Sequence, residues 1–196
     1  MDNNDYCKSK SFLQHRDRIN GILEGIPFAQ SPRGWILKGS FSIGGFRYFG
    51  FSESSDILFV SSSNGRGLID MFKNEKVARD YSNDYVIDEI LLTTEGFDIL
   101  EGHIIRLCGR NDECNGSSLP TKNKSEESLF RVSPFYPLED IIFQPPFENC
   151  LIETHNKNCV RVYRGYLYCY GFSFSGKYFV IANDGGVTFW ESDYIV

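Results

Sequence analysis

The sequence predicts a mainly β fold of antiparallel meander sheets with one N-terminal helix, and a mixed α+β arrangement is the alternative. Three observations support this prediction. Beyond residue 34 the chain consists of short apolar runs between Gly, Ser and Asn clusters, which are typical of strands joined by tight turns. Aromatic residues make up 15% and hydrophobic residues 41% of the 196 residues, enough for a sizeable core. A strand-and-turn pattern also occurs twice along the chain.

The N-terminal helix is predicted over residues 11–24, with Ser11 as its N-cap. Its apolar face consists of Phe12, Ile19, Ile22 and Leu23. We assign residues 1–30 to an N-terminal helical segment. The whole chain, 1–196, is assigned to a single domain, because no linker composition interrupts it.

Eleven short apolar runs are the predicted strands. They cover residues 35–37, 47–51, 57–61, 68–72, 104–108, 129–132, 141–144, 159–164, 167–172, 178–182 and 187–190. Residues 84–92 form a candidate short helix. The polar, Pro-containing segment 110–127 is predicted to be a long exposed loop.

An internal repeat relates residues 50–60 to residues 171–181 at an offset of 121. Each copy predicts a strand, a polar turn and a buried strand, and then continues through Gly65 or Gly186 to a third apolar run. This order of elements is that of a meander sheet. We expect both glycines to occupy turns, with positive φ in at least one of them.

The second copy, GFSFSGKYFVIANDGGVTFWE, resembles a blade hairpin of the tryptophan-aspartate-repeat β-propellers. In those proteins a Phe-Ser…Gly-Lys turn precedes a buried strand, and a Trp ends the next strand. Propeller repeats recur about every 40–45 residues, whereas these copies lie 121 residues apart. The resemblance therefore implies two blade-like repeats and not a complete regular propeller.

Targeting and redox features indicate a cytoplasmic protein that does not contact a membrane. The N-terminus lacks the basic start and apolar run of a secretory signal, and no spanning-length apolar run occurs. The six cysteines are sparse for a disulfide scaffold, so we expect reduced thiols.

Motifs for catalysis or metal binding are absent from the sequence. It contains no nucleophile elbow, phosphate loop or dinucleotide fingerprint, so we predict neither enzymatic activity nor a cofactor. Two His/Cys groups come nearest to a zinc site. They are His103-Cys108-Cys114 and Cys150-His155-Cys159. Their spacings match no common zinc module, so no metal site is predicted, and the sequence alone leaves zinc binding open.

The net charge of −6, from 26 acids and 20 bases, argues against direct binding of nucleic acid. Affinity for phosphates requires clustered Lys and Arg. Aromatic residues lie beside bases at residues 46–48 and 163–166, but alternation within strands explains these more simply than base stacking does.

The distribution of charge is more informative than its total. Residues 51–102 carry 11 acids and 4 bases, and residues 80–102 contain no Lys or Arg. Apolar residues are interleaved with these acids, and such a surface attracts a basic partner. The residues predicted to bind that partner are Asp84, Asp88, Glu89, Glu95, Asp98 and Glu101. The alternative is an ordinary solvated face whose apolar residues lie in the core.

Several short motifs stand in order along residues 46–190. They are Gly50-Phe51-Ser52, Val60-Ser61-Ser62, Gly65-Arg66-Gly67, Asp70, Lys76-Val77-Ala78-Arg79-Asp80, Leu100-Glu101-Gly102-His103-Ile104-Ile105-Arg106, Gly109 and Leu119-Pro120. Together they resemble the pattern of a poorly characterised group of bacterial proteins. Some small acidic members of that group are immunity proteins, which neutralise toxins of contact-dependent growth inhibition or related systems. The resemblance implies an inhibitor of a cognate toxin.

Three functional hypotheses follow. The first is an immunity protein that occludes the active site of a toxin domain, expected to be basic and nuclease-like because nuclease grooves are basic. The second is an enzyme that combines distant residues, His15 or His155 with Asp70 or Asp184. The third is a non-catalytic adaptor that uses the same acidic surface for an unrelated partner.

Overall fold

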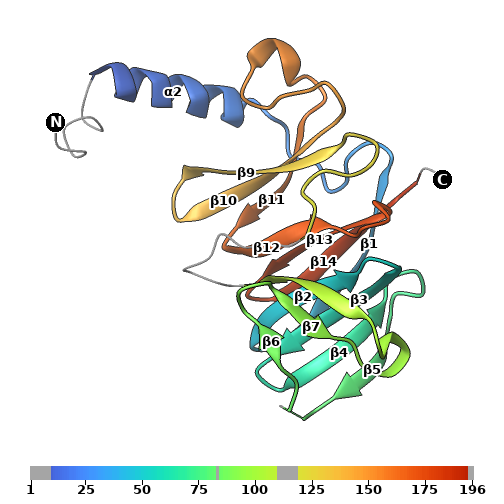
Figure 1. Cartoon of the computed structure of the whole chain (residues 1–196). Helices are drawn as coiled ribbons and strands as arrows, with labels where there is room; N and C mark the ends of the chain where they lie inside the picture. The colour runs from blue at the N-terminus through green and yellow to red at the C-terminus, as the bar shows by residue number, and fades with distance from the viewer. Residues whose placement is uncertain (1–9, 83, 110–118, 194–196) are drawn as a thin grey trace.

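The computed structural model describes residues 10–82, 84–109 and 119–193, and it is mainly antiparallel β with one N-terminal helix, as predicted (Figure 1). The helix is α2 (Lys10–Glu24). The strands are β1 (Trp35–Ser42), β2 (Phe46–Ser52), β3 (Ser55–Ser62), β4 (Gly65–Asp70), β5 (Glu75–Asp80), β6 (Ile87–Asp88), β7 (Thr93–Glu95), β8 (Ile104–Gly109), β9 (Ser128–Phe135), β10 (Leu138–Gln144), β11 (Val160–Gly165), β12 (Leu167–Phe172), β13 (Tyr178–Asn183) and β14 (Gly186–Ser192). Two short 3-10 helices are η1 (Asp98–Leu100) and η2 (Glu153–His155).

The strands of the described residues form three antiparallel sheets. The middle sheet has the order β1-β14-β13-β12, the three-stranded sheet β11-β10-β9, and the seven-stranded sheet β5-β4-β3-β2-β8-β7-β6. The middle sheet packs against the three-stranded sheet on one face and the seven-stranded sheet on the other, so the molecule is a stack of layers (Figure 1). This arrangement is neither a closed barrel nor a propeller.

Strand β13 shows why the middle sheet lies inside the stack. Tyr178 and Val180 pack with residues of β2 in one core cluster. Phe179 and Ile181 point to the opposite face and pack with residues of β10 in another cluster. Successive side chains in a strand alternate between faces, so a strand buried on both faces has a continuous apolar sequence. The run YFVIA in β13 meets that requirement.

Each of the eleven apolar runs coincides with a strand, although the run 68–72 continues two residues past the end of β4, and β5, β6 and β7 were not anticipated. β5 has the charged sequence EKVARD at the edge of its sheet, and β6 and β7 have only two and three residues. The candidate helix over residues 84–92 is wrong, because this stretch contains β6 and a turn. In that turn the Asp88 carboxylate accepts hydrogen bonds from the backbone N–H groups of Ile90 (2.9 Å) and Leu91 (2.8 Å), which favours a turn over a helix.

The two copies of the repeat form β2-β3-β4 and β12-β13-β14, and each is a meander. Gly65 and Gly186 open the third strand of each copy directly after the turn, and do not occupy the turn itself. Both have positive φ, +98° and +132°. A Cβ atom would lie 2.2 Å from the Asp80 carbonyl oxygen at Gly65 and 2.1 Å from the Phe41 carbonyl oxygen at Gly186. The close neighbouring backbone therefore requires glycine at both positions.

Helix α2 contacts the sheets through its C-terminal end. Leu23 and Ile19 pack with Ile142 of β10, whereas the N-terminal part of α2 extends away from the sheets (Figure 1). The predicted apolar face is therefore buried only at that end, and Ser11, the predicted N-cap, lies inside the helix. Within the described part of the chain, no helix is long and apolar enough to span a membrane.

Half of the predicted loop 110–127 is described, because residues 110–118 lie outside the described residues. In the other half Leu119 and Glu127 are buried, so the prediction of exposure is wrong for these two. Leu119 belongs to the core between the middle and seven-stranded sheets. A Glu127 carboxylate oxygen accepts a hydrogen bond from the Trp35 indole (3.4 Å).

Candidate protein-binding surface

The structure exposes all six acids that the sequence singles out as partner-binding residues. We call this set the acidic face. It consists of Asp84, Asp88, Glu89, Glu95, Asp98 and Glu101. These residues belong to β6, β7, η1 and the connections around them, at one end of the seven-stranded sheet.

Strand register places part of the acidic face on the outer surface of β6, β7 and β8. Glu95 pairs with Ile104, and both side chains are exposed. The neighbouring pair, Thr94 and Ile105, is buried and faces the interior of the sheet. Asp88 is likewise adjacent to an inward-facing residue of β6, so it projects to the same outer side as Glu95.

Exposed apolar side chains lie between the acids. They are Val86, Ile90, Leu91, Ile99 and Ile104, from 56% to 94% exposed. Leu92 and Leu100, by contrast, are buried in the core of the seven-stranded sheet. The interpretation that the apolar residues of this segment belong to the core is therefore correct for two of them and wrong for Ile90, Leu91 and Ile99. Exposed apolar groups rimmed by charge are typical of interaction surfaces.

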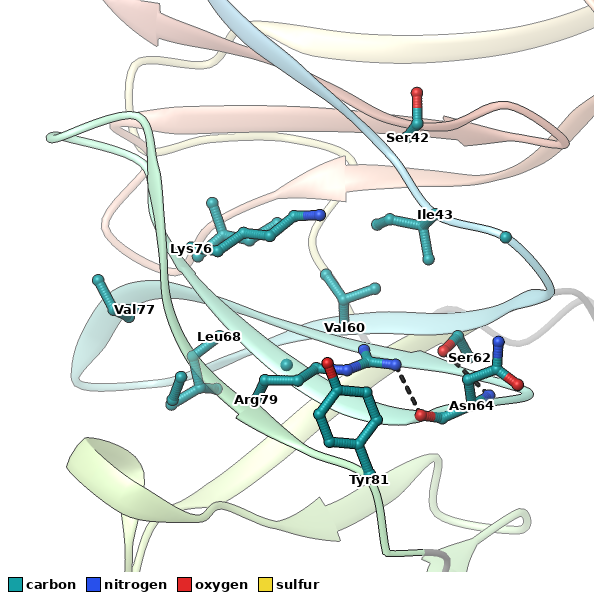
Figure 2. A pocket seen from close by; sticks show the side chains of 14 residues that line it. Ser42, Ile43, Val60, Ser62, Asn64, Leu68, Lys76, Val77, Arg79 and Tyr81 are labelled. Atoms are coloured by element: carbon teal, nitrogen blue, oxygen red, sulfur yellow. Dashed lines mark hydrogen bonds between the residues drawn. The ribbon is translucent and has the colours of Figure 1, made fainter.

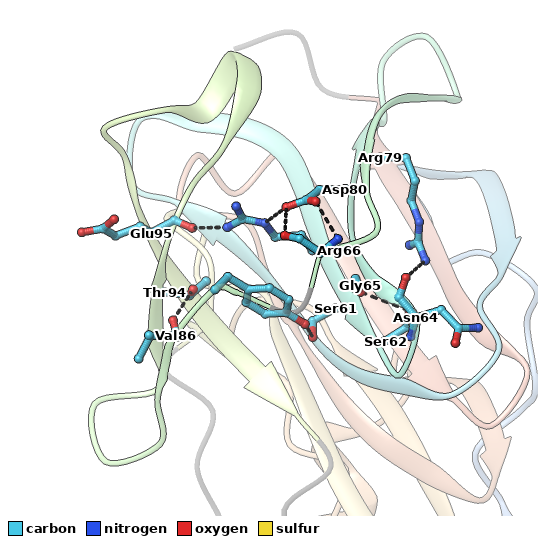
Figure 3. Close-up of polar contacts among 12 residues, drawn as sticks. Ser61, Ser62, Asn64, Gly65, Arg66, Arg79, Asp80, Val86, Thr94 and Glu95 are labelled. Carbon is cyan, nitrogen blue, oxygen red and sulfur yellow. Dashed lines mark hydrogen bonds and ion pairs between the residues drawn. The ribbon is translucent and has the colours of Figure 1, made fainter.

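A single cation, Arg66 of β4, holds the segment that carries the acidic face (Figure 3). Its guanidinium donates a hydrogen bond to Asp80 (2.9 Å) and another to the Glu95 carbonyl oxygen (3.3 Å). The same group lies 5.0 Å from the ring centroid of Tyr85 and 4.4 Å from that of Phe97. Ion pairing, hydrogen bonding and cation–π contacts thus converge on one side chain.

Further hydrogen bonds fix the same segment. The Tyr85 hydroxyl contacts the Ser61 hydroxyl of β3 (2.7 Å), and the Thr94 hydroxyl donates to the Val86 carbonyl oxygen (2.7 Å; Figure 3). The backbone N–H of Ser82, followed by Arg66, lowers the pKa of Asp80 below its ordinary value. The Asp80 side chain is only partly exposed and pairs with Arg66, whereas the six acids of the acidic face are exposed.

Replacing Arg66 with Gln should loosen residues 84–97 without unfolding the middle sheet. The substitution removes the charge from the hydrogen bonds to Asp80 and Glu95 and ends the cation–π contacts. Hydrogen exchange at amides in this segment should accelerate by about tenfold, because charge-assisted bonds contribute at that level. Arg131→Gln, which removes the charge from an arginine paired with Glu139 in the three-stranded sheet, is the control and should leave this segment unchanged. Equal exchange in both variants would contradict the role of Arg66.

Sequence reasoning missed Arg66 and Tyr85 as the residues that support this surface. The available signal was the motif Gly65-Arg66-Gly67, which places a cation between two small residues. Because Arg66 and Tyr85 are 19 positions apart, the contact becomes visible only when the sheet curls residues 84–97 over β3 and β4. Two bases lie around this surface: Arg106 is paired with Glu53 at 3.0 Å, and Arg47 lines a pocket together with Glu89.

A Ser/His pair lies in a shallow pocket next to the acidic face. The Ser52 hydroxyl is 2.9 Å from Nδ1 of His103. Among the described residues no carboxylate hydrogen-bonds this imidazole, so the orienting acid of a catalytic triad is missing. The second copy of the repeat contains the equivalent hydroxyl pair, Ser173 and Ser175, without a histidine contact. The serines are therefore a feature of the repeated turn.

The distant residues of the enzyme hypothesis are not brought together. His15 is exposed on α2, and His155 is exposed on η2, where its Nδ1 contacts the Thr154 hydroxyl (2.8 Å). Asp70 pairs with Lys73 at 3.2 Å, and Asp184 lies in the exposed turn after β13. In the described chain no hydrogen bond or ion pair connects either histidine with either aspartate.

The candidate zinc ligands do not assemble into a metal site among the described residues. Cys150 and Cys159 are buried in the cluster beneath α2, and burial raises the pKa of Cys150 to about 11 and that of Cys159 to about 12. Neutral thiols at pH 7 are poor metal ligands. The third candidate of this group, His155, is exposed, and Cys114 of the other group lies outside the described residues. Where the chain is described, no group of three or more His, Cys, Asp or Glu side chains could hold a metal ion.

Comparison with known protein families gives no match for this chain, and no curated protein sequence matches it. The chemistry of this surface is therefore the basis for assigning a function. Its elements are six exposed acids, exposed apolar side chains between them and an internal cation that holds the segment in place.

Proposed function

We propose that this protein is an immunity-type inhibitor that binds a basic toxin domain through the acidic face. The exposure of all six acids, together with apolar side chains such as Ile90 and Leu91, supports the proposal most directly. The motif resemblance to bacterial immunity proteins agrees with this role. No catalytic step by the inhibitor is needed, because occupying the active site of the toxin is sufficient.

The chemistry of a nuclease groove explains why such a surface suits it. A groove that binds nucleic acid presents Lys and Arg at the positions of phosphates. Carboxylates of the acidic face occupy equivalent positions and exclude the substrate. Long-range attraction between the opposite charges accelerates encounter, while the exposed apolar residues supply contacts that do not depend on salt.

The association rate tests the electrostatic part of the proposal. Charge reversal of Asp88 and Glu89 to Lys should slow association with the basic toxin domain by about tenfold at low salt. The difference should shrink as salt rises, because screening weakens interactions between exposed charges. The control reverses Glu153 and Asp184 to Lys, since both are exposed acids on other elements and give the same net charge. Stopped-flow mixing measures both rates, and equal slowing would indicate a general charge effect.

Protection of cells tests the inhibitory part. Cells that co-express the toxin should survive with the wild-type protein and die with a variant in which all six acids are Ala. Survival with that variant would exclude the acidic face as the inhibitory surface. Binding of the partner without protection would favour the adaptor hypothesis, since an adaptor uses the same surface but leaves its partner active.

A further inference from the structure

A pocket of about 580 Å³ lies beside the β4–β5 hairpin, and Arg66 is not among the residues that line it (Figure 2). Its walls are the end of β1 with the following turn and the strands β3, β4 and β5. Val60 and Ile69 form an apolar floor, and Ile43 covers one side.

A glycine forms part of the pocket floor. Gly67 of β4 pairs with Arg79 of β5 across the hairpin and lines the floor. A Cβ atom at Gly67 would lie 3.6 Å from the guanidinium of Arg79, which is ordinary van der Waals contact, so the Arg79 side chain passes directly over this part of the floor.

Two cations project into this pocket, and no acid lines it. Lys76 and Arg79 extend from β5 across the hollow in the same direction (Figure 2). Neither forms an ion pair within the described residues, whereas Arg66 and Lys73 of the same hairpin do. One amino group of Arg79 donates to the Asn64 carbonyl oxygen (2.6 Å), which holds the guanidinium over the pocket and leaves its other donors available.

The aromatic contacts of these cations support their arrangement. The Arg79 guanidinium lies 4.9 Å from the ring centroid of Tyr81, and Lys76 Nζ lies 5.7 Å from that of Phe41. Both cations are thus held near the pocket mouth without neutralisation by a carboxylate. The protein as a whole has a net charge of −6, whereas this pocket is lined by two cations that no carboxylate neutralises.

We propose that this pocket binds a small organic anion. Its carboxylate or phosphate group contacts Lys76 and Arg79, and its apolar body lies on Val60 and Ile69. Arginine offers a planar fork of donors suited to such oxyanions, and a partly apolar cavity with a few convergent polar groups is typical of small-molecule sites. This ligand is independent of the partner bound by the acidic face.

The probe for this site is 2-naphthoate, with the neutral 2-naphthamide as its matched control. Titration of the full chain, followed by amide NMR shifts, should give saturable changes at Gly44, Gly67 and Ala78 with 2-naphthoate. The amide should bind about tenfold more weakly, because it lacks the charge-assisted contact. Arg79→Gln and Lys76→Gln should each weaken binding of 2-naphthoate, whereas Lys73→Gln, on the same hairpin but paired with Asp70, should not.

Three results would overturn the proposal. They are the absence of saturable shifts at these amides, equal affinity for the acid and the amide, and unchanged affinity in both Gln variants of the pocket. A variant that reverses Asp88 and Glu89 should bind 2-naphthoate like the wild type, so failure of the acidic-face proposal and failure of this one are distinguishable.

Discussion

Replacing Asp140 with Ala should lower the free energy of unfolding by about 3–5 kcal/mol, because removing one partner of a buried ion pair leaves the other charge without compensation. Asp140 of β10 is 1% exposed. Its carboxylate accepts hydrogen bonds from Arg161 (2.8 Å) and from Arg164 (2.7 and 2.8 Å) of β11. Arg161 is itself buried and also donates to the Leu23 carbonyl oxygen (2.7 Å), so the network connects α2 to the three-stranded sheet.

Urea unfolding followed by circular dichroism measures this effect. The matched control is Glu53→Ala, which removes one partner of the exposed Glu53–Arg106 pair of the seven-stranded sheet. Exposed pairs contribute little, so this variant should lose less than about 1 kcal/mol. Similar losses in the two variants would show that Asp140 acts as an ordinary surface charge, contrary to its burial.

The strands of this chain could be predicted because the pattern of apolar residues along a strand depends on whether one or both of its faces are buried. The runs of β3 and β13 are continuous and apolar, and both strands are buried as expected. The pattern fails where the elements depend on distant contacts. β7 has three residues and forms because it pairs with β8, and β5 is charged because it is an edge strand.

The candidate surface was predictable in composition but not in geometry. The absence of bases from residues 80–102 pointed to the acids, yet burial or exposure of the interleaved apolar residues depends on how the seven-stranded sheet curls. Leu92 and Ile90 are two positions apart and equally apolar, but one is 6% and the other 94% exposed. The pocket with Lys76 and Arg79 could not be foreseen either, because it requires the end of β1 to lie beside β5.

The middle sheet should depend most strongly on Phe179, and Phe179→Ala should cost about 3–5 kcal/mol of unfolding free energy. Its ring is fully buried between the two tryptophans of the chain, 4.8 Å from Trp35 and 4.6 Å from Trp190 between ring centroids. Deleting it opens a cavity between the middle and three-stranded sheets, and the surrounding strands cannot close it without disturbing the opposite core.

Tryptophan fluorescence provides the measurement, because both tryptophans contact Phe179 and belong to the same core cluster. The folded variant should show altered tryptophan emission relative to the wild type. The urea concentration at which half of the variant is unfolded should also be lower, in proportion to the free energy of unfolding that is lost. Phe147→Ala is the control, since Phe147 is 97% exposed and its removal should change the free energy of unfolding by less than about 0.5 kcal/mol. An equally small change for Phe179→Ala would mean that the two sheets do not share this core, and the stacked arrangement of layers would then be wrong.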